Sequence, residues 1–114
     1  MKYIQFATAD GQQIRAINAD SFWLRLRGLI GRKLSPGQGL LLNHCDQIHT
    51  FFMAYAIDAV YLGKDYHILR IDAAVAPWRA CKKSPGCRYI LELPAYGAAA
   101  LALSTGAPLL PLAE

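Results

Sequence analysis

Hydrophobic and polar residues alternate in several short segments of the chain, as in β-strands that bury one face. Residues 3–9 and 12–17 flank Asp10-Gly11, a two-residue turn typical of a β-hairpin. The same pattern predicts strands at residues 40–43, 48–53, 57–62, 66–75 and 88–93, and a last edge strand at 109–112. The alternation within these segments predicts that Leu69, Ile71, Ala73, Val75, Tyr89, Leu91 and Leu93 point inward.

One segment has the 3.6-residue period of an amphipathic helix instead. Asp20 and Ser21 suit its N-cap, and Gly31 suits its C-terminal end. The apolar stripe of this helix consists of Phe22, Trp23, Leu26, Leu29 and Ile30. A second, alanine-rich helical turn is predicted at residues 97–103.

The order of these elements predicts the fold class. The strands are not separated by regular helices, so a doubly wound parallel sheet is not favoured. We predict a mainly β (α+β) fold, a compact antiparallel β-barrel or sandwich of about seven short strands with one or two covering helices. With 114 residues and no repeat or linker, the chain is expected to form a single domain over residues 1–114.

The composition is that of a globular protein, with 54% hydrophobic and 18% charged residues. Its apolar runs are too short to span a bilayer, and its first ten residues lack the apolar core of a secretion signal. We therefore expect a cytoplasmic protein without a transmembrane segment. The alternative is an exported protein whose signal has been removed.

The formal net charge is +4, and eight of the twelve basic residues lie in two segments that contain no acid. The first segment holds Arg25, Arg27, Arg32 and Lys33, and the second holds Arg79, Lys82, Lys83 and Arg88. If the two segments meet in space, they form a surface that attracts anions. The alternative is that both are ordinary solvated faces.

Residues 44–58 carry the most candidate chemistry, because two histidines, a cysteine and two acids surround an apolar run. Polar groups in such a run are costly unless they are hydrogen-bonded or used. His49 and Asp58 fall on predicted neighbouring strands, so we expect contact between them. Such a pair would make His49 a catalytic base polarised by Asp58. The alternative is a structural hydrogen bond that ties the two strands together.

Three cysteines add further candidates. Cys45 is a possible catalytic nucleophile beside His49, or simply a small core residue. Cys81 and Cys87 flank a Ser-Pro-Gly turn and are predicted to pair in an oxidising compartment but to stay thiols in a reducing one. A zinc site built from His44, Cys45 and His49 with Cys81 or Cys87 would not have the spacing of a zinc finger or ribbon, so no metal site is predicted.

Pro77-Trp78-Arg79 has the chemistry of a binding unit, because arginine clamps carboxylate or phosphate and tryptophan stacks on sugars and bases. The alternative is that Trp78 plugs one end of the fold and Arg79 pairs with Asp58. The chain contains no phosphate loop, dinucleotide fingerprint or RNA-binding aromatic signature. We therefore expect no cofactor and no nucleic-acid partner.

Several short segments, taken in order, resemble the domain-of-unknown-function 192 family of small bacterial and archaeal β-rich domains. They are Arg27–Arg32, Gly39–Leu41, Ile48–Met53 with Ile57-Asp58, Pro77–Arg79 and Leu91–Ala95. The activity of the family is not established. The resemblance implies a shared site of His49, Thr50, Asp58, Trp78 and Arg79, with Cys45 nearby. The chain departs from the family pattern at Ala54, Ala56, Tyr96 and Ala107, and the missing base at position 54 removes one candidate anion contact.

These observations favour a binding module for a small polar or anionic ligand, such as a saccharide or nucleotide fragment. Its proposed contacts are His49, Asp58, Trp78 and Arg79. A second hypothesis is a hydrolase or transferase that uses His49 and Asp58 as its general base. A third is a structural or partner-binding domain in which these residues only brace the fold. The sequence does not decide whether the protein is an enzyme, nor its oligomeric state.

Overall fold

The computed structural model describes residues 2–21 and 28–112, which form one seven-stranded sheet and a short helix. The strand order across the sheet is β5-β4-β6-β3-β2-β1-β7. The strands are β1 (Tyr3–Ala7), β2 (Gln13–Ala19), β3 (Gln38–Asn43), β4 (Ile57–Leu62), β5 (Ile68–Val75), β6 (Tyr89–Pro94) and β7 (Leu110–Pro111). Helix α2 (Gly97–Ala100) follows β6, and the mainly β prediction is confirmed.

The strand pairing is antiparallel except at one place. β1 and β2 form the hairpin predicted from Asp10-Gly11, with Tyr3 opposite Ile17 and Phe6 opposite Ile14. β2 and β3 run parallel, and residues 20–37 make the crossover between them. The sheet is therefore mixed, whereas the sequence predicted a purely antiparallel one.

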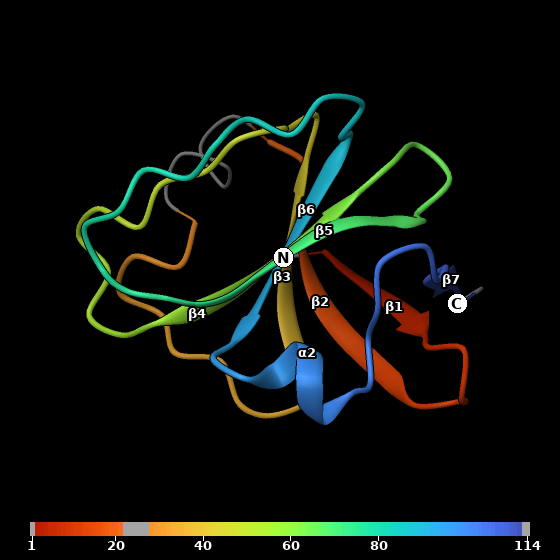
Figure 1. Ribbon diagram of the computed structural model, residues 1–114. Helices are drawn as coiled ribbons and strands as arrows, with labels where there is room; N and C mark the ends of the chain where they lie inside the picture. The colour runs from red at the N-terminus through yellow and green to blue at the C-terminus, as the bar shows by residue number, and fades with distance from the viewer. Residues whose placement is uncertain (1, 22–27, 113–114) are drawn as a thin grey trace.

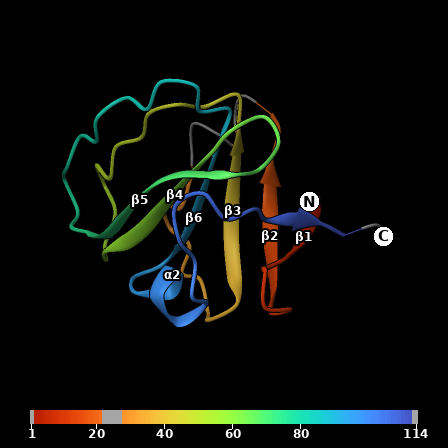
Figure 2. The same cartoon turned by 45° about the vertical axis from the view of Figure 1, so that its right-hand side comes forward.

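The sheet is strongly curled, and its two edges approach each other at one end (Figures 1 and 2). The segment before β7 meets the segment before β5, where Ile68 N–H donates to the Ala107 carbonyl at 2.9 Å and Leu109 N–H donates to the Tyr66 carbonyl at 3.0 Å. β7 then pairs with β1 at the opposite edge of the sheet. These contacts give the sheet the shape of a half-barrel.

Both faces of the central strands are buried, which explains why β3, β4 and β6 are rich in apolar residues without strict alternation. One face, here called the helix face, packs Leu41, Val60 and Leu91 with Ala98 of α2. The other, here called the loop face, packs Leu40, Ala59 and Ile90 beneath residues of the 44–56 loop. The candidate site lies on the loop face.

The predicted strand at residues 48–53 is wrong. Only a single bridge, between His49 and Ala80, is formed there, and Phe52 adopts a left-handed φ of 66°. Residues 44–56 instead form a long loop that runs beside the loop of residues 76–88 (Figure 1). Backbone hydrogen bonds of Ile48 and Thr50, together with the Thr50 hydroxyl, join this loop to its neighbour without forming a regular strand.

The predicted facing of β5 is also wrong, at Leu69 and at Ala73. Ile68 is buried, whereas Leu69 is 40% exposed. The register between β4 and β5 shifts twice, so the inward positions do not follow simple alternation. Ala73, which was predicted to point inward, is exposed, whereas its neighbour Asp72 accepts a hydrogen bond from the Tyr61 hydroxyl at 3.0 Å.

The predicted amphipathic helix falls largely on residues 22–27, which lie outside the described residues. Leu29, the next member of its stripe, is buried on the loop face. The predicted alanine-rich helical turn is confirmed as α2.

Among the described residues, no helix has the length and hydrophobicity needed to cross a membrane.

Candidate functional site

Thr50 joins the two long loops that cover the loop face. Its backbone N–H donates to the Arg79 carbonyl at 2.8 Å, and its own carbonyl accepts from Trp78 N–H at 3.0 Å. Its hydroxyl donates to the Ala76 carbonyl at 2.6 Å and accepts from Arg79 N–H at 2.9 Å. Thr50 is fully buried, so these bonds are shielded from water and fix the position of the loops.

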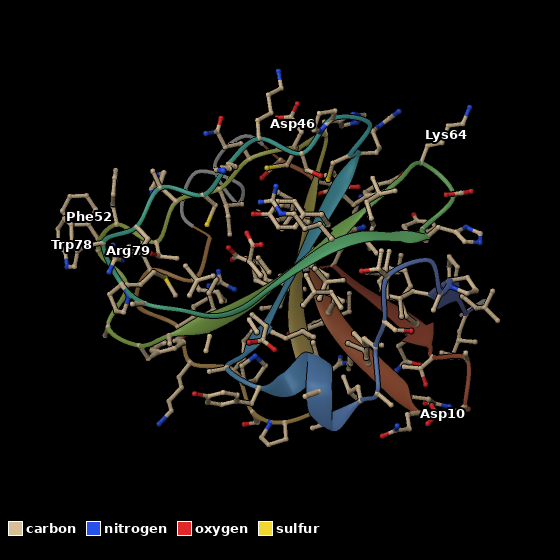
Figure 3. All side chains as sticks on the ribbon, viewed as in Figure 1. Asp10, Asp46, Phe52, Lys64, Trp78 and Arg79 are labelled. Carbon is tan, nitrogen blue, oxygen red and sulfur yellow. The ribbon has the colours of Figure 1, made fainter. Side chains whose placement is uncertain are left out.

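The two loops together present a cluster of aromatic side chains. The Phe51 ring stacks on His49 with centroids 4.7 Å apart and faces Trp78 at 6.0 Å, and Phe52 lies 4.8 Å from Trp78. Phe52 and Trp78 are 66% and 60% exposed. Figure 3 shows Phe52, Trp78 and Arg79 side by side at one extremity of the molecule. We call Phe51, Phe52 and Trp78 the aromatic tip.

Two residues of the aromatic tip have unusual backbone conformations. Phe52 and Trp78 have φ angles of 66° and 65°, in the left-handed region that non-glycine residues rarely adopt. Such strain persists only where surrounding contacts hold it, and it is concentrated at functional sites. Here the hydrogen bonds of Thr50 hold both loops while the large side chains stay in solvent.

A pocket of about 150 Å³ opens beside the aromatic tip. Glu92 of β6 lies at its inner end. In the sheet the backbone of Glu92 lies between Ala59 of β4 and Leu40 of β3. His49 and Phe51 line its mouth, and both are exposed. Between them the walls include Cys45, Gln47, Ile48 and Met53. We call this cavity the Glu92 pocket.

Glu92 is the one residue of this pocket whose chemistry conflicts with its surroundings. Its side chain is only 5% exposed, and its Oε1 atom has no hydrogen-bond partner among the described residues. Burial raises the pKa of Glu92 to about 8, because the charged form loses its hydration without gaining donors. Glu92 is therefore mainly protonated at neutral pH and can both donate and accept a hydrogen bond.

His49 lies at the rim of the pocket with one ring nitrogen already engaged. Its Nδ1 accepts a hydrogen bond from the backbone N–H of Phe51 at 3.2 Å. In the neutral imidazole the proton then sits on Nε2, which is a donor. The stacked Phe51 ring holds the imidazole plane in place.

Asp58 does not belong to this pocket. Its carboxylate accepts hydrogen bonds from the backbone N–H groups of Ala74 at 2.8 Å, Tyr96 at 3.0 Å and Ala98 at 2.9 Å. It points to the helix face, whereas His49 lines a pocket on the loop face. The predicted contact of Asp58 with His49 or Arg79 is therefore wrong, because backbone amides from β5 and the start of α2 satisfy the carboxylate.

The cysteines are free thiols, and the Cys81–Cys87 disulfide is not formed. The Cys87 thiol lies 3.4 Å from the Cys45 carbonyl and 3.1 Å from the Tyr89 carbonyl. Burial raises the pKa of both Cys81 and Cys87, which makes them weaker nucleophiles. Cys45 lines the Glu92 pocket, and its thiol donates to the Gln47 carbonyl at 3.2 Å.

The described residues contain no group of three or more His, Cys, Asp or Glu side chains that could hold a metal ion. The structure places His49, Thr50, Trp78 and Arg79 on two neighbouring loops, with Cys45 in the same pocket as His49, and their role as a functional site stays a prediction. It adds Glu92, which sequence reasoning did not select. The signal was present, since Glu92 is an acid in the middle of the apolar strand Tyr89–Pro94.

Comparison with known proteins agrees with this fold and places the chain in a family. The family model described as "Uncharacterized ACR" (DUF192) matches residues 5–110. A UPF0127 protein of Thermococcus sibiricus is 32% identical over 84 residues, which cover 67% of this chain and 52% of that protein. The chain thus belongs to the DUF192 family, and it spans about half the length of this curated relative.

Two solved structures share the fold. A crystal structure from Sinorhizobium meliloti, named provisionally as a transcription regulator, has a TM-score of 0.81 at 22% identity, covering 96% of this chain and 92% of that one. A protein of unknown function from Novosphingobium aromaticivorans has a TM-score of 0.81 at 18% identity, covering 94% and 82%. At these identities the likeness concerns the fold alone.

Proposed function

We propose that the protein is a binding module for a small hydroxylated ligand of the saccharide class, held between the Glu92 pocket and the aromatic tip. The observation that carries this proposal is the buried carboxyl of Glu92, whose Oε1 has no partner among the described residues and lies at the inner end of an open pocket. An unsatisfied buried polar atom costs about 1–3 kcal/mol. A ligand hydroxyl that bonds to Glu92 would remove that cost.

The chemistry of the site favours a sugar over a strong anion inside the pocket. A protonated Glu92 can donate to one hydroxyl and accept from another, whereas an anionic ligand group would have to be buried beside an acid. The Nε2 atom of His49 supplies a further polar contact at the rim. The exposed ring of Trp78 offers a flat face to the apolar side of a sugar ring. Arg79, at the same extremity, is placed to pair with an acidic substituent outside the pocket.

The test is a titration with glucose, N-acetylglucosamine and glucuronate, followed by ¹⁵N chemical shifts of the backbone amides. We expect saturable shifts at His49, Phe51 and Trp78. Glu92→Leu, which removes both the donor and the acceptor, and Trp78→Ala should each weaken binding by about tenfold, and Arg79→Ala should weaken only glucuronate. Tyr96→Ala is the matched control, because Tyr96 is also an aromatic residue, 69% exposed with a φ of 67°. Shifts spread evenly over the surface, or equal loss in the control, would refute the proposal.

One observation favours a second function, that of a hydrolase or transferase. Glu92, with its pKa near 8, shares a pocket with His49 and Cys45. A carboxyl that holds its proton at neutral pH has the form of a general acid. In this hypothesis Glu92 is the general acid, and Asp58, which the sequence had paired with His49, takes no part. Turnover of p-nitrophenyl glycosides or esters that is lost in Glu92→Gln but kept in Asp10→Asn would favour the enzyme.

A further inference from the structure

A second pocket on the loop face has a different electrostatic character. It measures about 330 Å³ and lies where β1, β2 and β3 meet the end of the crossover. Arg15, Arg32, Lys33 and Gln38 line it together with Tyr3, and no acid is among its lining residues. We call it the basic pocket. None of its basic residues lines the Glu92 pocket, so an argument about the basic pocket does not depend on the proposed function.

Two of the cationic side chains of the basic pocket, those of Arg15 and Lys33, form no ion pair with the other described residues. The stretch from residue 21 to residue 45, which supplies Arg32 and Lys33, contains no acid at all. A concave surface lined by one sign of charge concentrates counter-ions.

Two of the lining side chains are positioned before any ligand arrives. The guanidinium carbon of Arg15 lies 3.8 Å from the centroid of the Tyr3 ring in a cation–π contact, and its side-chain N–H groups donate no hydrogen bond to the other described residues. Gln38 accepts the backbone N–H of Ser35 through Oε1 at 2.9 Å, which leaves its amide N–H₂ as a donor. The backbone of Arg32 is also fixed, since its carbonyl accepts the Tyr55 hydroxyl and its N–H donates to the Leu29 carbonyl at 2.9 Å.

We infer that the basic pocket binds phosphate, either as the free ion or as the phosphate group of a small ester. Two N–H groups along one edge of a guanidinium can bond to two oxygens of the same phosphate. A phosphate dianion also balances three cationic side chains better than a singly charged carboxylate does. The amide of Gln38 adds a neutral donor. The basic pocket takes Arg32 and Lys33 from the first basic segment, and Arg15 of β2, which belongs to neither segment, in place of the second segment.

The experiment is a titration of the protein with inorganic phosphate at constant ionic strength, followed by ¹⁵N chemical shifts, with chloride as the reference anion. Saturable shifts are expected at Tyr3, Arg15 and Gln38. Arg15→Gln should raise the dissociation constant about tenfold, and Arg15→Lys, which keeps the charge but not the paired donors, should give a smaller rise. Arg88→Gln is the matched control, because Arg88 also lies over a tyrosine ring, at 6.0 Å from the centroid of Tyr89.

A second arm replaces phosphate with glycerol 3-phosphate. Tighter binding of the ester would identify a phosphorylated small molecule as the ligand, and equal binding would identify the ion itself. Linear, unsaturated shifts would overturn the inference, as would equal loss of affinity in Arg15→Gln and Arg88→Gln. Because the sugar titration reports on His49 and Trp78 instead, the two proposals can fail separately.

Discussion

Asp58 and Glu92 lie on the neighbouring strands β4 and β6, but their carboxyl groups occupy opposite faces of the sheet. In the register of these two strands Asp58 lies opposite Leu93, and the adjacent residues Ala59 and Glu92 lie opposite each other. Both side chains are buried, at 0% and 5% exposure. Asp58 accepts three backbone N–H groups, whereas Oε1 of Glu92 lacks a partner among the described residues. One acid therefore stabilises the fold, whereas the burial of the other is not compensated by hydrogen bonds to its Oε1 atom from the described residues.

Asp58→Asn should destabilise the protein by about 3 kcal/mol. The amide keeps the shape of the carboxylate but turns an N–H₂ group toward backbone donors, and hydrogen bonds to a charged acceptor contribute about 1.5–3 kcal/mol each. The measurement is the urea midpoint of unfolding. Asp10→Asn is the control, because Asp10 is an exposed turn residue, and it should cost less than about 1 kcal/mol. Equal effects of the two variants would show that Asp58 is not a structural anchor.

Glu92 should make the protein less stable as the pH rises. Its pKa is about 8 in the folded state and near 4.5 when unfolded, so between these values the folded state binds more protons than the unfolded state. The free energy of unfolding then falls with increasing pH from about pH 4.5 to pH 8, by up to roughly 5 kcal/mol from this group. Below pH 4.5 both states are protonated, and the contribution is constant.

Glu92→Gln tests this directly, since glutamine cannot ionise. The variant should be more stable than the parent at pH 8 and should lose the downward slope between pH 5 and pH 8. Urea unfolding across that range is the measurement. Parallel pH profiles for the two proteins would mean that Glu92 is ionised or solvated in the fold.

Thr50→Val should loosen the two loops that carry the aromatic tip. The valine keeps the β-branched shape but cannot donate to the Ala76 carbonyl or accept from Arg79 N–H. Leaving these two partly buried groups without their partner should cost about 1–3 kcal/mol. Faster hydrogen exchange is expected at the Trp78 and Arg79 amides. Thr105→Val, at an exposed turn, should change neither stability nor exchange.

Local patterns were sufficient to predict most of the fold. Asp10-Gly11 specified the first hairpin, and the apolar runs located β3, β4 and β6 to within a few residues. The failures have physical causes. Residues 48–53 have strand composition, but the hydrogen bonds of Thr50 to the 76–79 segment decide their conformation, and those bonds are made across the fold.

The candidate site could be predicted from the sequence only in part. His49, Thr50, Trp78 and Arg79 meet because two loops run side by side, and their chemistry was visible in the sequence. Asp58 was misassigned because the sequence does not show which face of the sheet a strand residue takes when both faces are buried. Glu92 was missed because its importance depends on donors that are absent around it, which only the packing of the loop face reveals.

Gly39→Ala should test how closely β3 and β6 approach beneath the helix face. A Cβ at position 39 would lie 2.9 Å from the Leu91 Cδ1 atom and 3.1 Å from the Glu92 carbonyl oxygen, and the oxygen cannot move without breaking strand pairing. We expect a loss of about 2–4 kcal/mol, measured by urea unfolding, because overpacking forces the strands apart. Gly11→Ala is the control. Its Cβ would meet open space, but its φ of 89° is unfavourable for alanine, so only the backbone cost of about 1 kcal/mol should be seen. A Gly39→Ala loss no larger than that of the control would mean that the sheet can relax at this contact.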